Sequence, residues 1–187
     1  MDRLKTFIQS QIKIEDTDLD IIISQFKELK ISKDRYALKK GQIATNFFFV
    51  KTGALRVYFE HNDEEITSWI ALENDFFTDL VSLKNQLPSR FYIQALEETV
   101  LLSINAVKME QLYSQFPLWQ QFGRQIWESN FIKIVDGIIG FQTLTAEQRY
   151  ISLMSDSDLL QRVPLKHLAS FLGITTTSLS RLRKKIK

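Results

Sequence analysis

Residues Val163–Lys187 read VPLKHLASFLGITTTSLSRLRKKIK, and their spacing decides the fold of the C-terminal part of the chain. The apolar residues of the first half recur every three or four positions, so they share one face of a helix. Gly173 supplies the positive-φ residue that ends such a helix, and Thr175 suits the N-cap of a second one. Ala169 is small enough for the two helices to touch. The pattern predicts a helix-turn-helix, with its buried stripe on Leu165, Leu168, Leu172, Leu179, Leu182 and Ile186.

The outer face of the second helix is rich in hydroxyls and bases. Hydroxyls in its first turn can bond phosphates or base edges, and Arg181, one turn later, can reach a guanine or a phosphate. The bland alternative is a pair of amphipathic helices that close a bundle. We therefore expect this face to bind double-stranded DNA, with these candidate contact residues: Thr175, Thr176, Thr177, Ser178, Ser180, Arg181, Arg183, Lys184 and Lys185.

The composition excludes several classes of protein. The 187 residues include no cysteine, which rules out disulfides, thiolate zinc sites, cysteine nucleophiles and all-cysteine iron–sulfur clusters. No run approaches the roughly 20 apolar residues that a membrane span needs, and the first residues lack a signal segment. These features favour a cytoplasmic protein without a membrane partner.

The formal net charge of +2 conceals an asymmetry. Residues 1–116 carry a net charge of −3, whereas residues 117–187 carry +5. A basic end is commonly only a solvated face, so the charge by itself is weak support for nucleic-acid binding.

The first part of the chain changes period. Residues 4–29 have helical spacing, and from about Ile31 the apolar residues alternate in short runs separated by turn signals. One such run, residues 55–60, is followed by HNDEE, which reads as a hairpin turn. Several short strands at regular spacing predict an antiparallel barrel or sandwich.

A long amphipathic helix is expected over residues 117–142. It is too apolar to be exposed along its length, so either its own barrel or a second chain covers it. We expect a homodimer and a division into residues 1–116, 117–142 and 143–187. The predicted dimer seam consists of Trp119, Phe122, Ile126, Ser129, Lys133 and Asp136.

This order of elements resembles the Crp/Fnr family of bacterial transcription regulators. The resemblance rests on KKGQI…FFFVKTGALRVYF, FFTDLVSL…PSRFYIQALEETVLLSI, TAEQRYISLM and HLASFLGITTTSLSRLRKKI, and the last is similar to a short-tailed subgroup. It implies an α+β protein: a jelly-roll β-barrel like those that bind cyclic nucleotides, a dimerisation helix, and a helix-turn-helix domain of the winged-helix type. It also implies a pseudo-palindromic operator and RNA polymerase as a partner. Any wing must come from residues before Pro164.

The sequence departs from the cyclic-AMP binders of that family in the phosphate cassette. Thr78-Asp79 occupies the place of their Gly-Glu pair, and Ser89-Arg90 the place of their Arg-Ser or Arg-Thr pair. Without the bidentate arginine the strongest phosphate anchor is missing, so we expect no standard cyclic-AMP binding and leave the effector unassigned. The candidate pocket residues are Phe77, Thr78, Asp79, Leu80, Ser89 and Arg90.

Two other functions compete with transcription regulation. The chain could be a sensing module with a degenerate DNA-binding half that acts through protein contacts. It could also be a metalloenzyme on a cupin-like barrel, but that chemistry needs several histidines around one metal. The two histidines, His61 and His167, lie in different predicted parts. We therefore expect no catalytic residues, no metal site and no evident cofactor.

Overall fold

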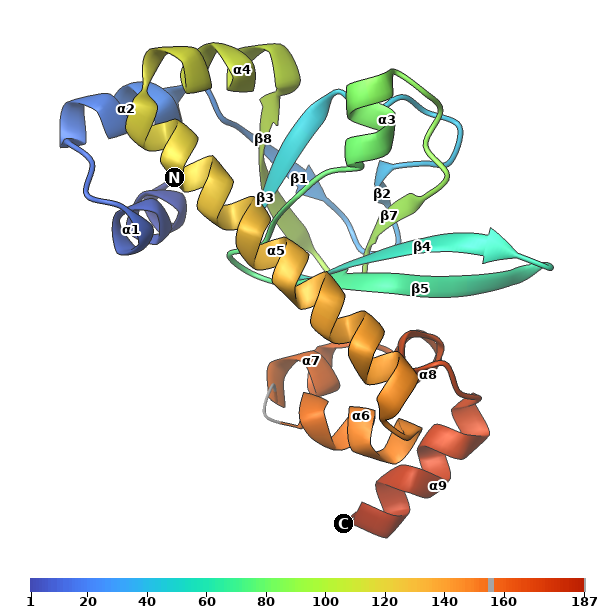
Figure 1. Cartoon of the computed structure of the whole chain (residues 1–187). Helices are drawn as coiled ribbons and strands as arrows, with labels where there is room; N and C mark the ends of the chain where they lie inside the picture. The colour runs from blue at the N-terminus through green and yellow to red at the C-terminus, as the bar shows by residue number, and fades with distance from the viewer. Residues whose placement is uncertain (155–156, 187) are drawn as a thin grey trace.

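The computed structural model describes residues 1–154 and 157–186, and Lys187, the last base of the C-terminal run, lies outside them. The described strands form two four-stranded antiparallel sheets, in the orders β1-β8-β3-β6 and β2-β7-β4-β5. This is the predicted jelly-roll arrangement (Figure 1). The strands are β1 (Lys27–Ile31), β2 (Tyr36–Leu38), β3 (Asn46–Thr52), β4 (Leu55–His61), β5 (Glu64–Ala71), β6 (Phe76–Phe77), β7 (Tyr92–Ala95) and β8 (Thr99–Asn105).

In the sequence, helices precede the strands, interrupt them once at α3 and follow them. Figure 1 shows α5 running from the barrel to a separate group of C-terminal helices, α6 to α9. The described residues of that group contain no strand, so no wing is seen among them. The helices are α1 (Asp2–Gln11), α2 (Asp16–Ser24), α3 (Leu80–Asn85), α4 (Ala106–Gln115), α5 (Pro117–Thr143), α6 (Ala146–Leu153), α7 (Ser157–Arg162), α8 (Leu165–Leu172) and α9 (Thr176–Ile186).

The prediction of a helix up to residue 29 was wrong at its end. Residues 27–29 belong to β1, which pairs with β8 from Lys27↔Ser103 to Ile31↔Thr99. The main-chain bonds of that ladder override the helical spacing of a short apolar segment. The predicted hairpin is confirmed, because β4 and β5 pair around Asn62 and Asp63, both with positive φ.

The core of the barrel is filled by aromatic side chains. The run Asn46–Val50 lies in β3, and Phe47, Phe48 and Phe49 are all buried. Phe48 packs against Phe77 and Phe49 against Phe76, both of β6. Phe47 packs against Trp127 of α5. The phenylalanine run is therefore a core strand, as its composition indicated.

The predicted dimer seam on α5 was wrong at two residues. Trp119 and Phe122 are 0% and 2% exposed and stack on each other inside the barrel core. Ile126 also packs against this core, and Lys133 pairs with Asp75 of the barrel. The helix turns that side toward its own sheet, so its exposed apolar face lies elsewhere. The exposed apolar residues opposite that side are Phe131, Ile132 and Ile139, whereas Ile134, Ile138 and Phe141 line a cavity toward the barrel and the C-terminal helices.

A second hydrophobic core joins the barrel to the C-terminal helices. Three of its buried members, Ala54, Ile70 and Leu96, come from the barrel. The remaining buried members come from the helices: Tyr150, Leu159, Val163, Leu168, Ala169, Leu172 and Leu179. The C-terminal helices therefore complete their core on the surface of the barrel. Among the described residues, no helix combines the length and hydropathy that a bilayer span requires.

Candidate nucleic-acid interface and effector cassette

The predicted helix-turn-helix is present in α8 and α9. Gly173 ends α8 with φ 69°, and its amide bonds to the carbonyl of Ser170. The hydroxyl of Thr175 accepts the amide of Ser178 at 3.1 Å, which confirms Thr175 as the cap of α9. Ala169 and Leu179 are buried where the two helices meet. The sequence spacing therefore builds the motif that it predicted.

One face of α9 is open to solvent and carries polar side chains. Leu179 is buried, and Leu182 and Ile186 pack against the second core on the same side. Thr176 and Thr177 are exposed in the first turn of α9. Arg181 and Lys184 are exposed further along the helix. This side could lie in a DNA groove without disturbing the core.

Arg183 does not share this face, so its assignment as a DNA contact was wrong. Its guanidinium lies 6.0 Å from the ring of Tyr150, and its Nη2 donates to the carbonyl of Leu160 at 3.4 Å. Lys185 forms an ion pair with Glu147 of α6 at 3.0 Å, although its side chain is exposed. Arg183 thus helps to hold α9 on α6 and α7.

The effector cassette brings Asp79 and Ser89 together. Asp79 caps α3, because its Oδ1 accepts the amide of Ser82 at 3.1 Å. The hydroxyl of Ser89 donates to the other oxygen, Oδ2, at 2.7 Å and accepts the amide of Phe91. Ser89 is buried, and its backbone also bonds Gly41 and Gln42. A carboxylate of the chain itself therefore uses the donors that an incoming anion would need.

The other predicted cassette residues have separate surroundings. Thr78 donates to the carbonyl of Asn46 at 2.8 Å, which fixes the entry to α3. Phe77 is buried in the barrel core, whereas Leu80 and Arg90 are exposed. The guanidinium of Arg90 lies 5.8 Å from the ring of Phe91, outside the cassette. No contact of Arg90 replaces the missing phosphate-binding arginine.

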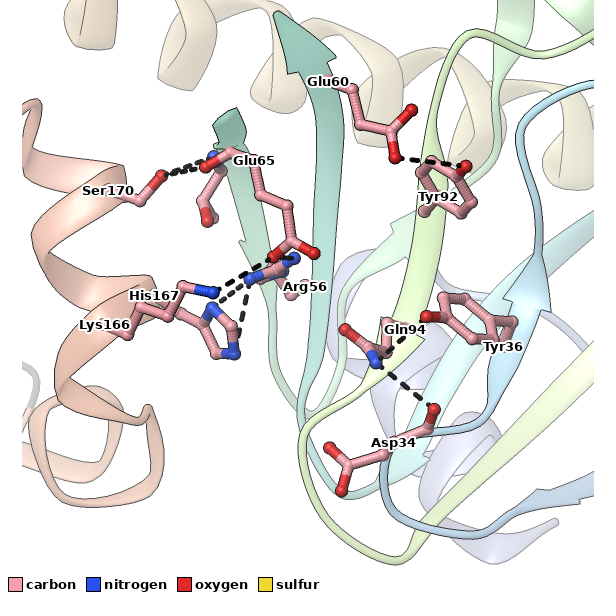
Figure 2. A network of polar contacts seen from close by, with 11 residues as sticks. Asp34, Tyr36, Arg56, Glu60, Glu65, Tyr92, Gln94, Lys166, His167 and Ser170 are labelled. Carbon is pink, nitrogen blue, oxygen red and sulfur yellow. Dashed lines mark hydrogen bonds and ion pairs between the residues drawn. The ribbon is translucent and has the colours of Figure 1, made fainter. Parts of the chain in front are cut away.

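A polar network on the outer face of the β4–β5 hairpin was not predicted (Figure 2). Arg56 of β4 is only 1% exposed, and its Nη2 donates to Oε2 of Glu65 at 2.6 Å. Its Nη1 contacts Nδ1 of His167 on α8. The guanidinium also lies 3.7 Å from the ring centre of Tyr58, a cation–π contact. Nothing in the sequence pattern of β4 indicated that α8 would cover Arg56.

A second ion-pair cluster joins α7 to the barrel. Arg162 binds both carboxylate oxygens of Glu73, at 2.7 and 2.9 Å, and its Nε donates to Glu97 at 3.0 Å. The amide of Gly53 also donates to Glu73 at 2.8 Å. Bidentate pairing fixes orientation as well as distance. Two charged clusters thus fasten the C-terminal helices to the barrel.

Within residues 1–154 and 157–186, no three histidine or acidic side chains converge as a metal site would require. His61 is exposed in the β4–β5 turn region, and His167 faces Arg56.

Comparison with known proteins gives two results: a family model matches the barrel, and solved structures share the fold. Residues 28–116 match the family described as the cyclic nucleotide-binding domain. A search of curated protein sequences gave no match.

Solved structures share the fold of most of the chain. FixK2 from Bradyrhizobium japonicum has a TM-score of 0.72 at 18% identity, with 86% of this chain and 84% of that chain covered. A CooA mutant from Carboxydothermus hydrogenoformans has a TM-score of 0.67 at 22% identity, covering 88% and 77%. The c-di-GMP responsive global regulator CLP from Xanthomonas campestris has 0.68 at 14%, covering 92% and 91%.

The contacts between barrel and C-terminal helices should weaken as the pH falls. Burial, together with the charge of Arg56, lowers the pKa of His167 from 6.5 to about 4. Between pH 4 and 6.5, the unfolded chain therefore binds a proton at His167 that the folded chain does not bind. The stability contributed by neutral His167 is present above pH 6.5 and is lost as the pH falls toward 4. His167→Gln should remove this pH dependence when the melting temperature is followed by calorimetry.

Glu73 contributes a second pH dependence of stability, at more acidic pH, and the exposed His61 provides a control variant. Burial raises the pKa of Glu73, but the hydrogen bonds from Arg162 and Gly53 outweigh it and lower the pKa to about 2. Its contribution is present above the ordinary value of 4.5 and is lost as the pH falls to 2. His61→Gln should leave the whole profile unchanged. A His167→Gln profile parallel to that of the native chain between pH 6.5 and 4 would refute the assignment.

Proposed function

We propose that this chain, whose residues 28–116 belong to the cyclic nucleotide-binding domain family and whose fold is that of the Crp/Fnr regulators, is a homodimeric transcription regulator that binds double-stranded DNA through α9. The observation that carries the proposal is the exposed polar face of α9. It offers hydroxyls at its start and Arg181 and Lys184 further along, on a helix whose other face is packed. This is the chemistry of a recognition helix in the major groove.

The homodimer is supported by the exposed apolar face of α5. Phe131, Ile132, Ile134, Ile138, Ile139 and Phe141 are between 50% and 66% exposed. Helical geometry places Phe131, Ile132 and Ile139 on the side of the helix opposite Trp119 and Phe122, whereas Ile134, Ile138 and Phe141 line the cavity toward the barrel and the C-terminal helices. A face of this kind calls for a partner, and a two-fold partner gives the paired recognition helices that a pseudo-palindromic operator requires. Of the seam predicted from the sequence, Trp119 and Phe122 are excluded by burial, whereas Ser129 and Asp136 are exposed and stay in the proposal.

We propose that the barrel does not bind a cyclic nucleotide through this cassette. A phosphate in a half-buried site needs a positive partner or several free donors, because desolvating the anion is costly. Here Asp79 already accepts from Ser82 and Ser89, and Arg90 faces outward. Displacing a carboxylate by another anion gains no charge pairing. These donors of the cassette are therefore already paired with a carboxylate of the chain itself.

The DNA proposal is tested with a duplex selected from a random library by the native protein. Arg181→Ala should weaken binding to this duplex by about 1–3 kcal/mol if Arg181 reads a base. Lys185→Ala should lower the affinity for all sequences alike and reduce the salt dependence. In sedimentation, the protein at micromolar concentration should have about twice the mass of 21.9 kDa.

Arg183→Ala provides the matched control, because it removes an equal charge from the packed side of α9. It should lower the melting temperature more than it changes base preference. If Arg181→Ala and Lys185→Ala both leave binding untouched, or if the chain remains a monomer on DNA, the proposal fails.

The effector proposal is tested by calorimetric titration with cyclic AMP and cyclic GMP. The native chain should show no saturable binding, because Asp79 occupies the donors of the cassette. The control variants are Ser89→Asp, which adds a negative charge inside the cassette, and Arg90→Ala, which removes one outside it. A low-micromolar dissociation constant that Ser89→Asp abolishes and Arg90→Ala preserves would show that the anion does enter the cassette.

A further inference from the structure

The free edge of strand β5 is covered by a single serine of α8. β5 is the last strand of the sheet β2-β7-β4-β5, so one side of it has no strand partner. The amide of Thr67 donates to Oγ of Ser170 at 2.9 Å, and the same hydroxyl donates to the carbonyl of Glu65 at 2.9 Å. Ser170 thus bonds one donor and one acceptor of the strand, as a neighbouring strand would. This contact fixes the position of α8 along β5.

The side chains next to Ser170 fix the rotation of α8 about its own axis. His167 lies one turn before Ser170 and contacts Arg56, and Lys166 approaches Glu65 at 3.9 Å. Figure 2 shows these side chains converging between the hairpin and the helix. Because Arg56 is buried and carries a full charge, losing its partners would be costly. The helix therefore has one preferred position on the hairpin, which we call its seat.

The seat of α8 determines the direction of α9. Ala169 and Leu172 of α8 share a buried core with Leu179 of α9, and a single left-handed residue, Gly173, ends α8. The two helices can therefore move only as one unit. A dimer on DNA must hold its two recognition helices about one helical turn of the duplex apart, roughly 34–36 Å. A unit that is loose on its barrel could not keep this separation.

We infer that the edge of β5 is the docking seat of the DNA-binding unit, and that Ser170 and Arg56 are positioning residues that set the orientation of α9 on the operator. This inference rests on the proposed function. Neither side chain is on α9, so neither is placed to touch a base. Their effect is on the geometry of binding rather than on the contacts to DNA.

The same hairpin is in contact with the effector cassette. Ser89 bonds Phe91, the next residue Tyr92 stacks on Tyr58 with ring centres 4.8 Å apart, and Arg56 lies over Tyr58. A change in the cassette would therefore reach the seat through packed neighbours. The seat thus lies at the point where a signal from the barrel would act on α9.

The test displaces α8 and measures two properties. Because the chain has no cysteine, spin labels can be placed on cysteines introduced at the exposed positions Arg90 and Lys184. Labelled chain is diluted with unlabelled chain, so that the distance within one protomer is recorded without DNA. Ser170→Tyr puts a wedge between α8 and β5, and Arg56→Met removes the buried charge at similar volume. Both should broaden or shift the distance, whereas Ser170→Thr, which retains the hydroxyl, should not.

The second measurement uses the duplex selected by the native chain and versions of it with altered half-site spacing. Ser170→Tyr and Arg56→Met should weaken binding to the selected duplex about tenfold or more and should relax the preference for its spacing. Binding to unrelated DNA should be unchanged, since phosphate contacts tolerate a loose orientation. Ser114→Ala is the matched control, because that hydroxyl bonds only Glu110 of its own helix.

Three results would be decisive against the inference. An unaltered distance in both Ser170→Tyr and Arg56→Met would show that these residues do not hold the seat. A displaced α9 with native affinity and native spacing preference would show that the seat does not position it, and a gain in affinity would show that docking opposes binding. Failure of the proposed function would look different, because the native chain itself would then bind no duplex.

Discussion

The burial of Arg56 on the outer face of a sheet is the constraint on which the arrangement of the chain depends. A guanidinium that is 1% exposed needs hydrogen-bond partners, and the barrel alone supplies only Glu65 and the ring of Tyr58. His167 of α8 supplies the third side. Together with Ile70 in the second core, this fixes where the C-terminal helices lie. The chain is therefore best described as a barrel and a helical unit that share one interface.

The barrel has a role in this interface even though Asp79 already pairs with the hydrogen-bond donors of its cassette. Asp79 accepts hydrogen bonds around α3 that an anion bound in the cassette would need. The barrel keeps the jelly-roll architecture, while Asp79 accepts hydrogen bonds from the donors of the cassette. What the barrel still provides is a rigid sheet with an exposed edge, and α8 binds that edge.

The sequence predicted the elements well and their mutual contacts less well. Gly173, Thr175 and the leucine spacing predicted α8 and α9 because helix ends and buried faces are local properties. In contrast, the side of α5 that faces the barrel could not be chosen, since Trp119 and Phe131 are both apolar and only the fold decides between them. Arg162, Glu73 and Ser170 act through contacts more than 85 residues apart, and no spacing rule indicates these.

The central claim is that the barrel and the C-terminal helices are docked through β5, and hydrogen exchange of the Thr67 amide tests it most directly. This amide lies on an edge strand, and its acceptor is the hydroxyl of Ser170. If docking is part of the native fold, the Thr67 amide should exchange as slowly as amides in the barrel core, through global unfolding. Exchange at the fast rate of an open sheet edge, in a chain whose core amides remain protected, would contradict the account.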